Sequence, residues 1–289
     1  SVQIFLYRTD LFHDAKLCRA YYERFHENLV VPTTYEQYLH AAEFFTRSCN
    51  PDSPTEYGTT MTCGSASVAA SDFLPFYLSR IDRFGSTPET LRLDCPEMQA
   101  AMRQYHALEK FSCKQNWWGD SIQKFAEGKT AMTVIYSNYA AELINSGNSV
   151  VVGRVGAAIL PGCKPLLGGG IVGISRYSQK AEACKQFFHW YYSADVASLL
   201  VRLGGTSPIV DAYEDFQNYS IFPWMNTSKK SFGLGQRGVI NQTPERFSIP
   251  KYEFAVGTAV RNVVQDLMTP EDASRMAQAL YDAADPVCR

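Results

Sequence analysis

The spacing of hydrophobic positions along this chain changes between the pattern of a strand and the pattern of a helix. Residues 2–8 form an apolar run that predicts a strand, and from Leu11 to Phe25 the apolar positions recur at helical spacing after Asp10. The next helix begins near residues 33–34, where Thr33 with Glu36, or Thr34 with Gln37, predicts a capping box. The chain therefore opens as a strand followed by two helices.

The same alternation continues to the end of the sequence. Further strands are predicted at 57–62, 129–136, 150–160 and 171–175. Further helices are predicted after Ser71 or Asp72 (with Pro75 in the first turn), from Cys95 to Cys113, and at 117–126, 139–144, 181–192, 194–203, 253–267 and 270–284. Residues 204–250 are rich in Gly, Pro, Asn and Ser and are predicted to be mostly loop. Strands that alternate with helices indicate an α/β fold.

Composition and charge narrow the function classes. Apolar residues make up 46% and charged residues 19% of the 289 residues, which is typical of a globular protein of one or two domains. The net charge of -2 gives no basic footprint for nucleic acid or an anionic membrane. No stretch approaches the ~20 apolar residues of a membrane span, and residues 1–7 do not resemble a signal peptide.

Cysteine and histidine patterns do not indicate catalysis or a metal site. The 8 cysteines include no C-x-x-C pair, and we expect them to be small buried apolar residues. Cys95 and Cys113 flank a predicted helix that spans ~27 Å, too far for a disulfide. The five histidines show no H-E-x-x-H spacing and no nucleophile partner, so we expect no enzyme activity, no metal and no cofactor.

One segment is more specific than the rest. Residues 125–132 read F-A-E-G-K-T-A-M, in which Gly128 is placed to end a helix with a positive φ and Ala131-Met132 to enter a buried strand. This segment resembles the F-x-x-G-K-x-A-M pattern of family 1 extracellular solute-binding proteins of the maltose-binding type. Other landmarks of that family follow in its order, at residues 6–12, 31–36, 156–162, 168–175, 180–190, 204–208 and 254–260.

The resemblance implies a fold and a function. The fold is the type II periplasmic-binding-protein-like α/β fold, with two lobes that close by a hinge and with the first lobe incomplete in this chain. It implies that residues 1–155 and 222–289 form the C-terminal lobe and that residues 156–221 are the remaining segment of the N-terminal lobe. The expected function is capture of a small solute, a saccharide first of all, for the permease of an ABC importer. The expected location is extracytoplasmic, with a lipid anchor upstream of these residues.

The resemblance also implies binding residues between the lobes. Tyr7 and Tyr139 match aromatic positions of the cleft, and Trp117 with Trp118 forms a dense aromatic cluster beside Asp120. Tyr139 is predicted to lie at a helix N-terminus, where free backbone N–H groups can meet a ligand oxygen.

Three positions depart from the family pattern. Gly170 and Glu253 stand where relatives often carry a stacking Trp, and Arg8 stands in place of an Asn. Arg8 and Glu253 are predicted either to form an ion pair at the rim or to recognise a charged or amino-bearing ligand. Three alternatives stay open: a ligand-sensing ectodomain of a signalling protein with the same fold, an enzyme of unknown type, and a metal or anion binder.

Overall fold

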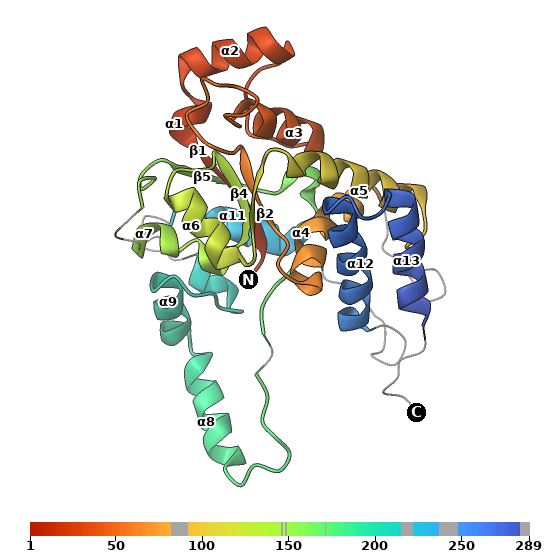
Figure 1. The fold of residues 1–289 in the computed structure, drawn as a ribbon. Helices are drawn as coiled ribbons and strands as arrows, with labels where there is room; N and C mark the ends of the chain where they lie inside the picture. The colour runs from red at the N-terminus through yellow and green to blue at the C-terminus, as the bar shows by residue number, and fades with distance from the viewer. Residues whose placement is uncertain are drawn as a thin grey trace.

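The structure is a computed structural model that describes residues 1–81, 92–145, 147, 149–170, 172–214, 222–236 and 248–283 (Figure 1). The strands are β1 (Gln3–Arg8), β2 (Thr59–Thr62), β3 (Ser112–Gln115), β4 (Met132–Tyr136) and β5 (Val155–Ala158). The α-helices are α1 (Thr9–Phe12), α2 (Ala15–Phe25), α3 (Tyr35–Phe44), α4 (Ala66–Leu78), α5 (Pro96–Glu109), α6 (Trp118–Ala126), α7 (Glu142–Asn145), α8 (Ala181–Tyr191), α9 (Ala194–Arg202), α11 (Met225–Leu234), α12 (Ile249–Val264) and α13 (Pro270–Asp282). Short 3-10 turns are η2 (Ser137–Tyr139), η3 (Pro161–Cys163) and η4 (Val210–Tyr213).

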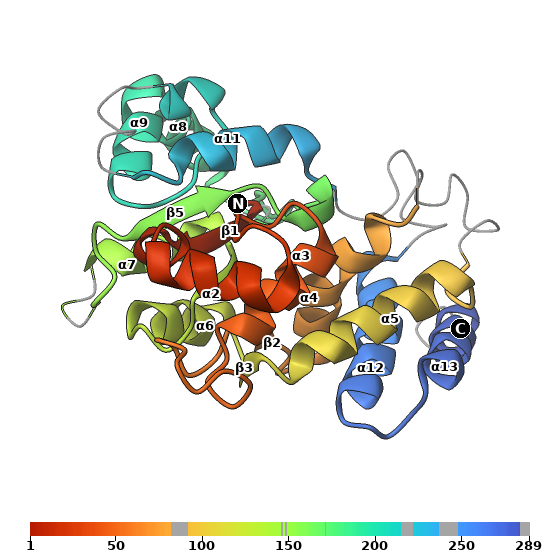
Figure 2. The same cartoon turned by 90° about the horizontal axis from the view of Figure 1, so that it is seen from above.

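Strand β1 is the centre of the main sheet. It pairs antiparallel with β4 on one side, where Phe5 lies opposite Val134, and with β5 on the other, where Phe5 lies opposite Ala158. Strands β2 and β3 form a separate parallel pair, which the hydroxyls of Thr60 and Thr133 connect to β4 at 2.7 Å. The apolar run of β1 is buried because helices cover the sheet on both faces (Figures 1 and 2).

Helix boundaries follow the capping chemistry. The Thr34 hydroxyl accepts from the Gln37 N–H at 3.2 Å, and the Gln37 side chain accepts from the Thr34 N–H. Of the two predicted capping boxes, the one formed by Thr34 and Gln37 is therefore confirmed. The predicted helix 11–25 is instead two helices, because the Asp14 carboxylate caps a new start and accepts from the Lys16 N–H. Gly128 follows α6 with a φ of +72°, as predicted.

Helix α4 begins earlier than predicted. Ser65 caps it by accepting from the Val68 N–H, so Ser71 and Asp72 lie in its interior and Pro75 lies in its last turns. A proline there leaves the carbonyl of the residue four positions before it without its helical donor. In this protein the Gln3 side chain supplies that donor, because its Nε2 donates to the Ser71 carbonyl at 2.8 Å.

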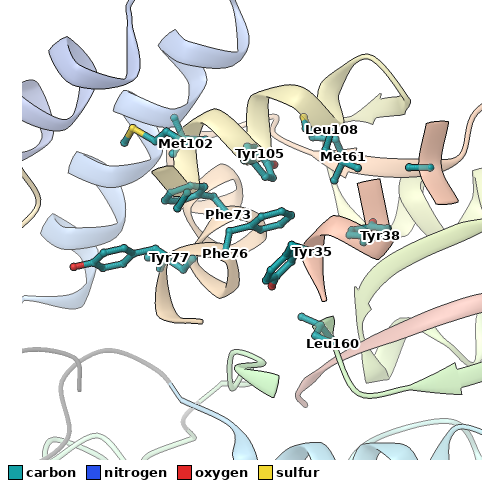
Figure 3. Close-up of a cluster of buried hydrophobic side chains, with 14 of the residues drawn as sticks. Tyr35, Tyr38, Met61, Phe73, Phe76, Tyr77, Met102, Tyr105, Leu108 and Leu160 are labelled. Carbon is teal, nitrogen blue, oxygen red and sulfur yellow. The ribbon is translucent and has the colours of Figure 1, made fainter. Parts of the chain in front are cut away.

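Helices α4, α5, α12 and α13 pack side by side next to the sheets (Figures 1 and 2). Aromatic rings fill the space between α3, α4 and α5, where Tyr35 stacks on Phe76 with centroids 3.8 Å apart (Figure 3).

Asp72 of α4 is buried beside this apolar cluster. Its Oδ2 accepts from the Tyr105 hydroxyl at 2.7 Å and from the Thr62 N–H at 3.2 Å. Burial raises the pKa of Asp72 to about 7, although both hydrogen bonds favour the ionised form. The cost of removing the carboxylate from water therefore outweighs the two bonds that stabilise it.

Two predictions for the second half of the chain were wrong. Residues 172–175 join no sheet among the described residues, and residue 171 lies outside them. The stretch 204–250 contains helix α11, which packs on β1, as well as the turn η4. Helix α8, which was predicted as a helix, buries no residue, and its Phe187 and Trp190 are 50% and 58% exposed.

The cysteines form no disulfide in the described part of the chain. Free thiols are present at the seven described positions, including Cys95 and Cys113, which agrees with the helix-length argument. Cys49 and Cys163 are exposed, so the expectation that every cysteine is buried was wrong.

We predict that Asp72→Asn changes how stability depends on pH. The folded protein holds a proton on Asp72 up to about pH 7, whereas the unfolded chain releases it near its ordinary pKa of about 4. The wild-type free energy of unfolding should therefore fall as pH rises between those values, by about 4 kcal/mol at most. The amide of the variant keeps an oxygen for both hydrogen bonds and does not titrate, so its urea unfolding should lack this fall.

Asp52→Asn, which removes an exposed carboxyl, is the matched control and should keep the wild-type profile. Parallel pH profiles for the wild type and Asp72→Asn would show that Asp72 ionises in the folded protein as it does in the unfolded chain.

We also predict that Gln3→Leu destabilises the protein by about 2–5 kcal/mol, because two buried partners lose their hydrogen bonds: the Ser71 carbonyl and the Leu166 N–H. Pro75→Ala in that background restores a helical N–H for Ser71 and should recover part of the loss. Gln123→Leu, at an exposed position of α6, is the control. A double-mutant cycle by urea unfolding measures this coupling, and strictly additive effects of the two substitutions would contradict it.

Candidate functional site

A pocket of about 450 Å³ lies where β4, α4, α6 and α12 meet, beside Ser1. Helix α4 contributes Ser67, Val68 and Ser71, and the start of α6 contributes Trp117 and Trp118. The segment after β4 contributes Asn138 and Tyr139, with Tyr136 at the end of the strand. Ser1, Gly168, Gly169, Thr206 and Glu253 complete the described wall.

The aromatic side of the wall is ordered by its own contacts. The Trp117 indole N–H donates to the Tyr139 hydroxyl at 2.8 Å, while Trp117 stays 48% exposed. Trp118 is buried and meets both Trp117 and Tyr136 edge to face, with centroids 4.9 Å apart in each pair. Trp118 therefore supports the wall from behind, and Trp117 presents a ring to the pocket.

Two glycines allow the wall to close. A Cβ on Gly168 would lie 2.6 Å from the Tyr136 ring, so only glycine lets that segment cross the ring. A Cβ on Gly257 would lie 1.7 Å from the Ala66 carbonyl oxygen, so α12 and the start of α4 approach backbone to backbone. Glu253 lies one turn before Gly257 on the same face of α12, and this close approach brings it to the pocket that Ser67 also lines.

Trp117, Trp118, Tyr139 and Glu253, which were singled out in the sequence, thus lie together in this wall. Tyr139 ends the 3-10 turn η2, so the expected helix N-terminus at that residue was wrong. Gly170 is exposed beside Gly169, and nothing lies within 4 Å of a Cβ built on it.

Tyr7 and Arg8 lie at the other end of β1. Seven residues of extended strand span about 23 Å, so these side chains are remote from the pocket edge at Ser1. Tyr7 packs on Phe12 with centroids 5.3 Å apart. Arg8 pairs with Asp10 at 2.7 Å, which replaces the predicted ion pair with Glu253. A ligand-binding role for Tyr7 and Arg8 stays a prediction.

Hydroxyl and amide groups of the wall were missed in the sequence. Ser67 and Ser71 are four residues apart on α4, Asn138 follows β4, and Thr206 comes from the Gly-Gly-Thr-Ser-Pro loop. The spacing of the two serines was a usable signal, since it places both on one helix face. Nothing local in the sequence relates Thr206 to α4.

The groups of the wall suit a polyhydroxylated solute. Indole and phenol rings suit the C–H faces of such a solute, and the Ser, Thr, Asn and Glu side chains supply donors and acceptors for its hydroxyls. The described residues contain no cluster of three or more His, Cys, Asp or Glu side chains arranged to hold a metal ion. Among them, no helix has the length and apolar character needed to cross a membrane.

We predict that Gly257→Ala destabilises the protein by about 1–3 kcal/mol, because the added methyl forces α12 away from Ala66. Gly233→Ala is the matched control, since Gly233 also lies inside a helix but has nothing within 4 Å of its would-be Cβ. That control should stabilise by about 0.5–1 kcal/mol through helix propensity. Urea unfolding measures both, and equal effects would contradict the close approach of the two helices.

Solved structures with this fold are numerous. An ABC transporter solute-binding protein from Agrobacterium radiobacter K84 in complex with ribitol aligns with a TM-score of 0.74 at 22% identity, over 96% of this chain and 68% of that one. Maltose-bound MalE3 of T. maritima aligns with a TM-score of 0.76 at 19% identity, over 96% and 70%. A solute-binding protein from Agrobacterium vitis S4 with bound D-mannitol aligns with a TM-score of 0.70 at 18% identity, over 97% and 70%.

These likenesses in fold agree with the sequence itself. The sequence model of the family described as bacterial extracellular solute-binding protein matches residues 1–224. The protein has the type II periplasmic-binding-protein fold and belongs to the bacterial extracellular solute-binding protein family.

Proposed function

We propose that this protein captures a saccharide or related polyol outside the cytoplasm and delivers it to the permease of an ABC importer. The observation that carries the proposal is the wall in which the half-exposed Trp117 ring and Tyr139 face the same pocket as Ser67 and Ser71. An apolar ring beside several hydroxyls matches the two surfaces of a sugar, which has C–H faces and a rim of hydroxyls.

The related structures support the same class of solute. The proteins named above were solved with ribitol, maltose and D-mannitol, and a further one from Thermotoga lettingae was solved with alpha-D-tagatose. All four are neutral polyols or sugars. We extend only that class of solute to this chain. We also propose that the chain binds and releases the solute without catalysing a reaction on it. Tethering by a lipid anchor upstream of these residues stays a prediction.

The lobe assignment is also a proposal. The resemblance assigns residues 1–155 and 222–289 to one lobe and residues 156–221 to the other. Because β5 pairs with β1 up to Ala158, we move the first boundary so that it follows that residue. The support is helix α8, which extends away from the rest of the chain (Figure 1). Its half-exposed Phe187 and Trp190 leave apolar area on the surface of this segment.

We predict that a neutral sugar or polyol from the set ribitol, D-mannitol, tagatose and maltose raises the melting temperature of this protein. A ligand at 100 times its Kd stabilises the folded state by about 2.7 kcal/mol. Trp117→Ala should weaken this binding at least about tenfold, because it removes the exposed ring and the partner of the Tyr139 hydroxyl.

Trp190→Ala is the control, because it removes a similarly exposed indole from helix α8, outside the pocket. Calorimetric titration measures the affinities. Equal loss in both variants, or unchanged binding in Trp117→Ala, would count against this pocket as the solute site.

A further inference from the structure

Thr206 reaches the pocket wall from a loop that is fixed on both sides of it. On the side before it, helix α9 ends in a Schellman motif, for which Gly204 takes a positive φ of +85°. The Gly204 N–H donates to the Val201 carbonyl at 3.0 Å. The Gly205 N–H donates to the Leu200 carbonyl at 2.9 Å. The motif ends at Gly205, so Thr206 of the pocket wall follows it directly.

On the side after Thr206, one hydroxyl holds both backbone groups of the next residue. The Tyr213 hydroxyl accepts from the Ser207 N–H at 2.9 Å and donates to the Ser207 carbonyl at 3.0 Å. Ser207 and Tyr213 are both buried, so bulk water has little access to these bonds. Burial also raises the pKa of Tyr213, so the hydroxyl keeps the proton that it donates at neutral pH.

Tyr213 is itself anchored outside the loop. It lies in η4, and its ring meets Phe232 of α11 with centroids 5.7 Å apart. Helix α11 packs on β1, and its Thr227 hydroxyl donates to the Ala157 carbonyl of β5 at 3.1 Å. The contacts thus run from the main sheet through α11 and Tyr213 to the loop. The loop is therefore held by the main sheet and not by a helix of the pocket wall.

We propose that Tyr213 is a positioning residue of the solute site: its hydroxyl fixes the backbone beside Thr206 and so holds the Thr206 hydroxyl where a solute hydroxyl can bond to it. This inference rests on the proposed function, because it adds a residue to the same site. Tyr213 is not among the described residues that line the pocket, so it acts through Thr206. A loop that is already ordered spares the solute the entropy cost of fixing that hydroxyl on binding.

The first test measures the hold on the loop without any solute. In the wild type the Ser207 amide should exchange slowly with deuterium, because it is buried and donates to Tyr213. Tyr213→Phe removes the acceptor and keeps the ring, so the exchange rate read by NMR should rise about tenfold. Exchange of Ser207 in the wild type at the rate of an unfolded peptide overturns the proposal without any variant.

Tyr38→Phe is the matched control. It also removes a buried tyrosine hydroxyl, one that bonds to the Thr59 hydroxyl at 2.6 Å, outside the pocket. The Ser207 amide should exchange at the wild-type rate in this variant. An equal rise in both variants would reflect a general loss of stability and overturns a specific hold of Tyr213 on the loop.

The second test measures the affinities for ribitol, D-mannitol, tagatose and maltose by calorimetric titration. Thr206→Val replaces the hydroxyl with a methyl group of similar shape and should weaken binding about three- to tenfold. Tyr213→Phe should weaken binding within the same range, whereas Tyr38→Phe should bind as the wild type does. The double variant should bind no more weakly than Thr206→Val alone, because Tyr213 acts through Thr206. Unchanged affinity in Tyr213→Phe, or additive losses in the double variant, overturns the proposal.

Failure of the proposed function has a different signature. If none of the four solutes binds the wild type while Ser207 exchange rises in Tyr213→Phe alone, saccharide capture is wrong and the hold of Tyr213 on the loop is supported.

Discussion

The fold depends on the position of β1, and a single side chain fixes much of it. Gln3 lies in the central strand and is fully buried, so both ends of its amide need partners. Its Nε2 donates to the Ser71 carbonyl that Pro75 leaves without a helical donor, and its Oε1 accepts from the Leu166 N–H. One amide thus joins the sheet, helix α4 and the segment that leads to Gly168. Because α4 and that segment are both walls of the pocket, the site depends on the same contact.

The parts of this fold that the sequence predicts are those with local chemistry. Thr34 with Gln37 and Thr269 ahead of Pro270 are capping signals within one turn, and the helices begin there. Helix α4 was misplaced for the opposite reason. Asp72 has the chemistry of a helix cap, but its carboxylate is bonded to Tyr105 and Thr62, which are distant in sequence. Pro75 was assigned to the first turn of a helix, because the group that makes it acceptable near the helix end comes from another element. That group is the Gln3 side chain, which donates to the Ser71 carbonyl.

The pocket shows the same division. Trp117, Trp118 and Tyr139 were found because an aromatic cluster and a family landmark are visible within a few residues. Thr206 was missed because it meets the wall only through tertiary folding. Arg8 was expected either to pair with Glu253 or to meet a ligand, but the strand places it about 23 Å from the pocket edge at Ser1, and its guanidinium pairs with Asp10, two residues away. Its role in binding stays a prediction. Local patterns thus identify which side chains are suited to binding, and topology decides which of them meet.

The wall of the pocket is held rigid by packing. Trp118 is buried between Trp117 and Tyr136, and Gly257 lets α12 pack backbone to backbone on α4, so both the ring and the carboxylate are held before any solute arrives. A wall that is already ordered loses little side-chain entropy when it binds a solute. Thr206 differs from these residues, because it lies on the loop after α9 and is not held by a helix of the wall.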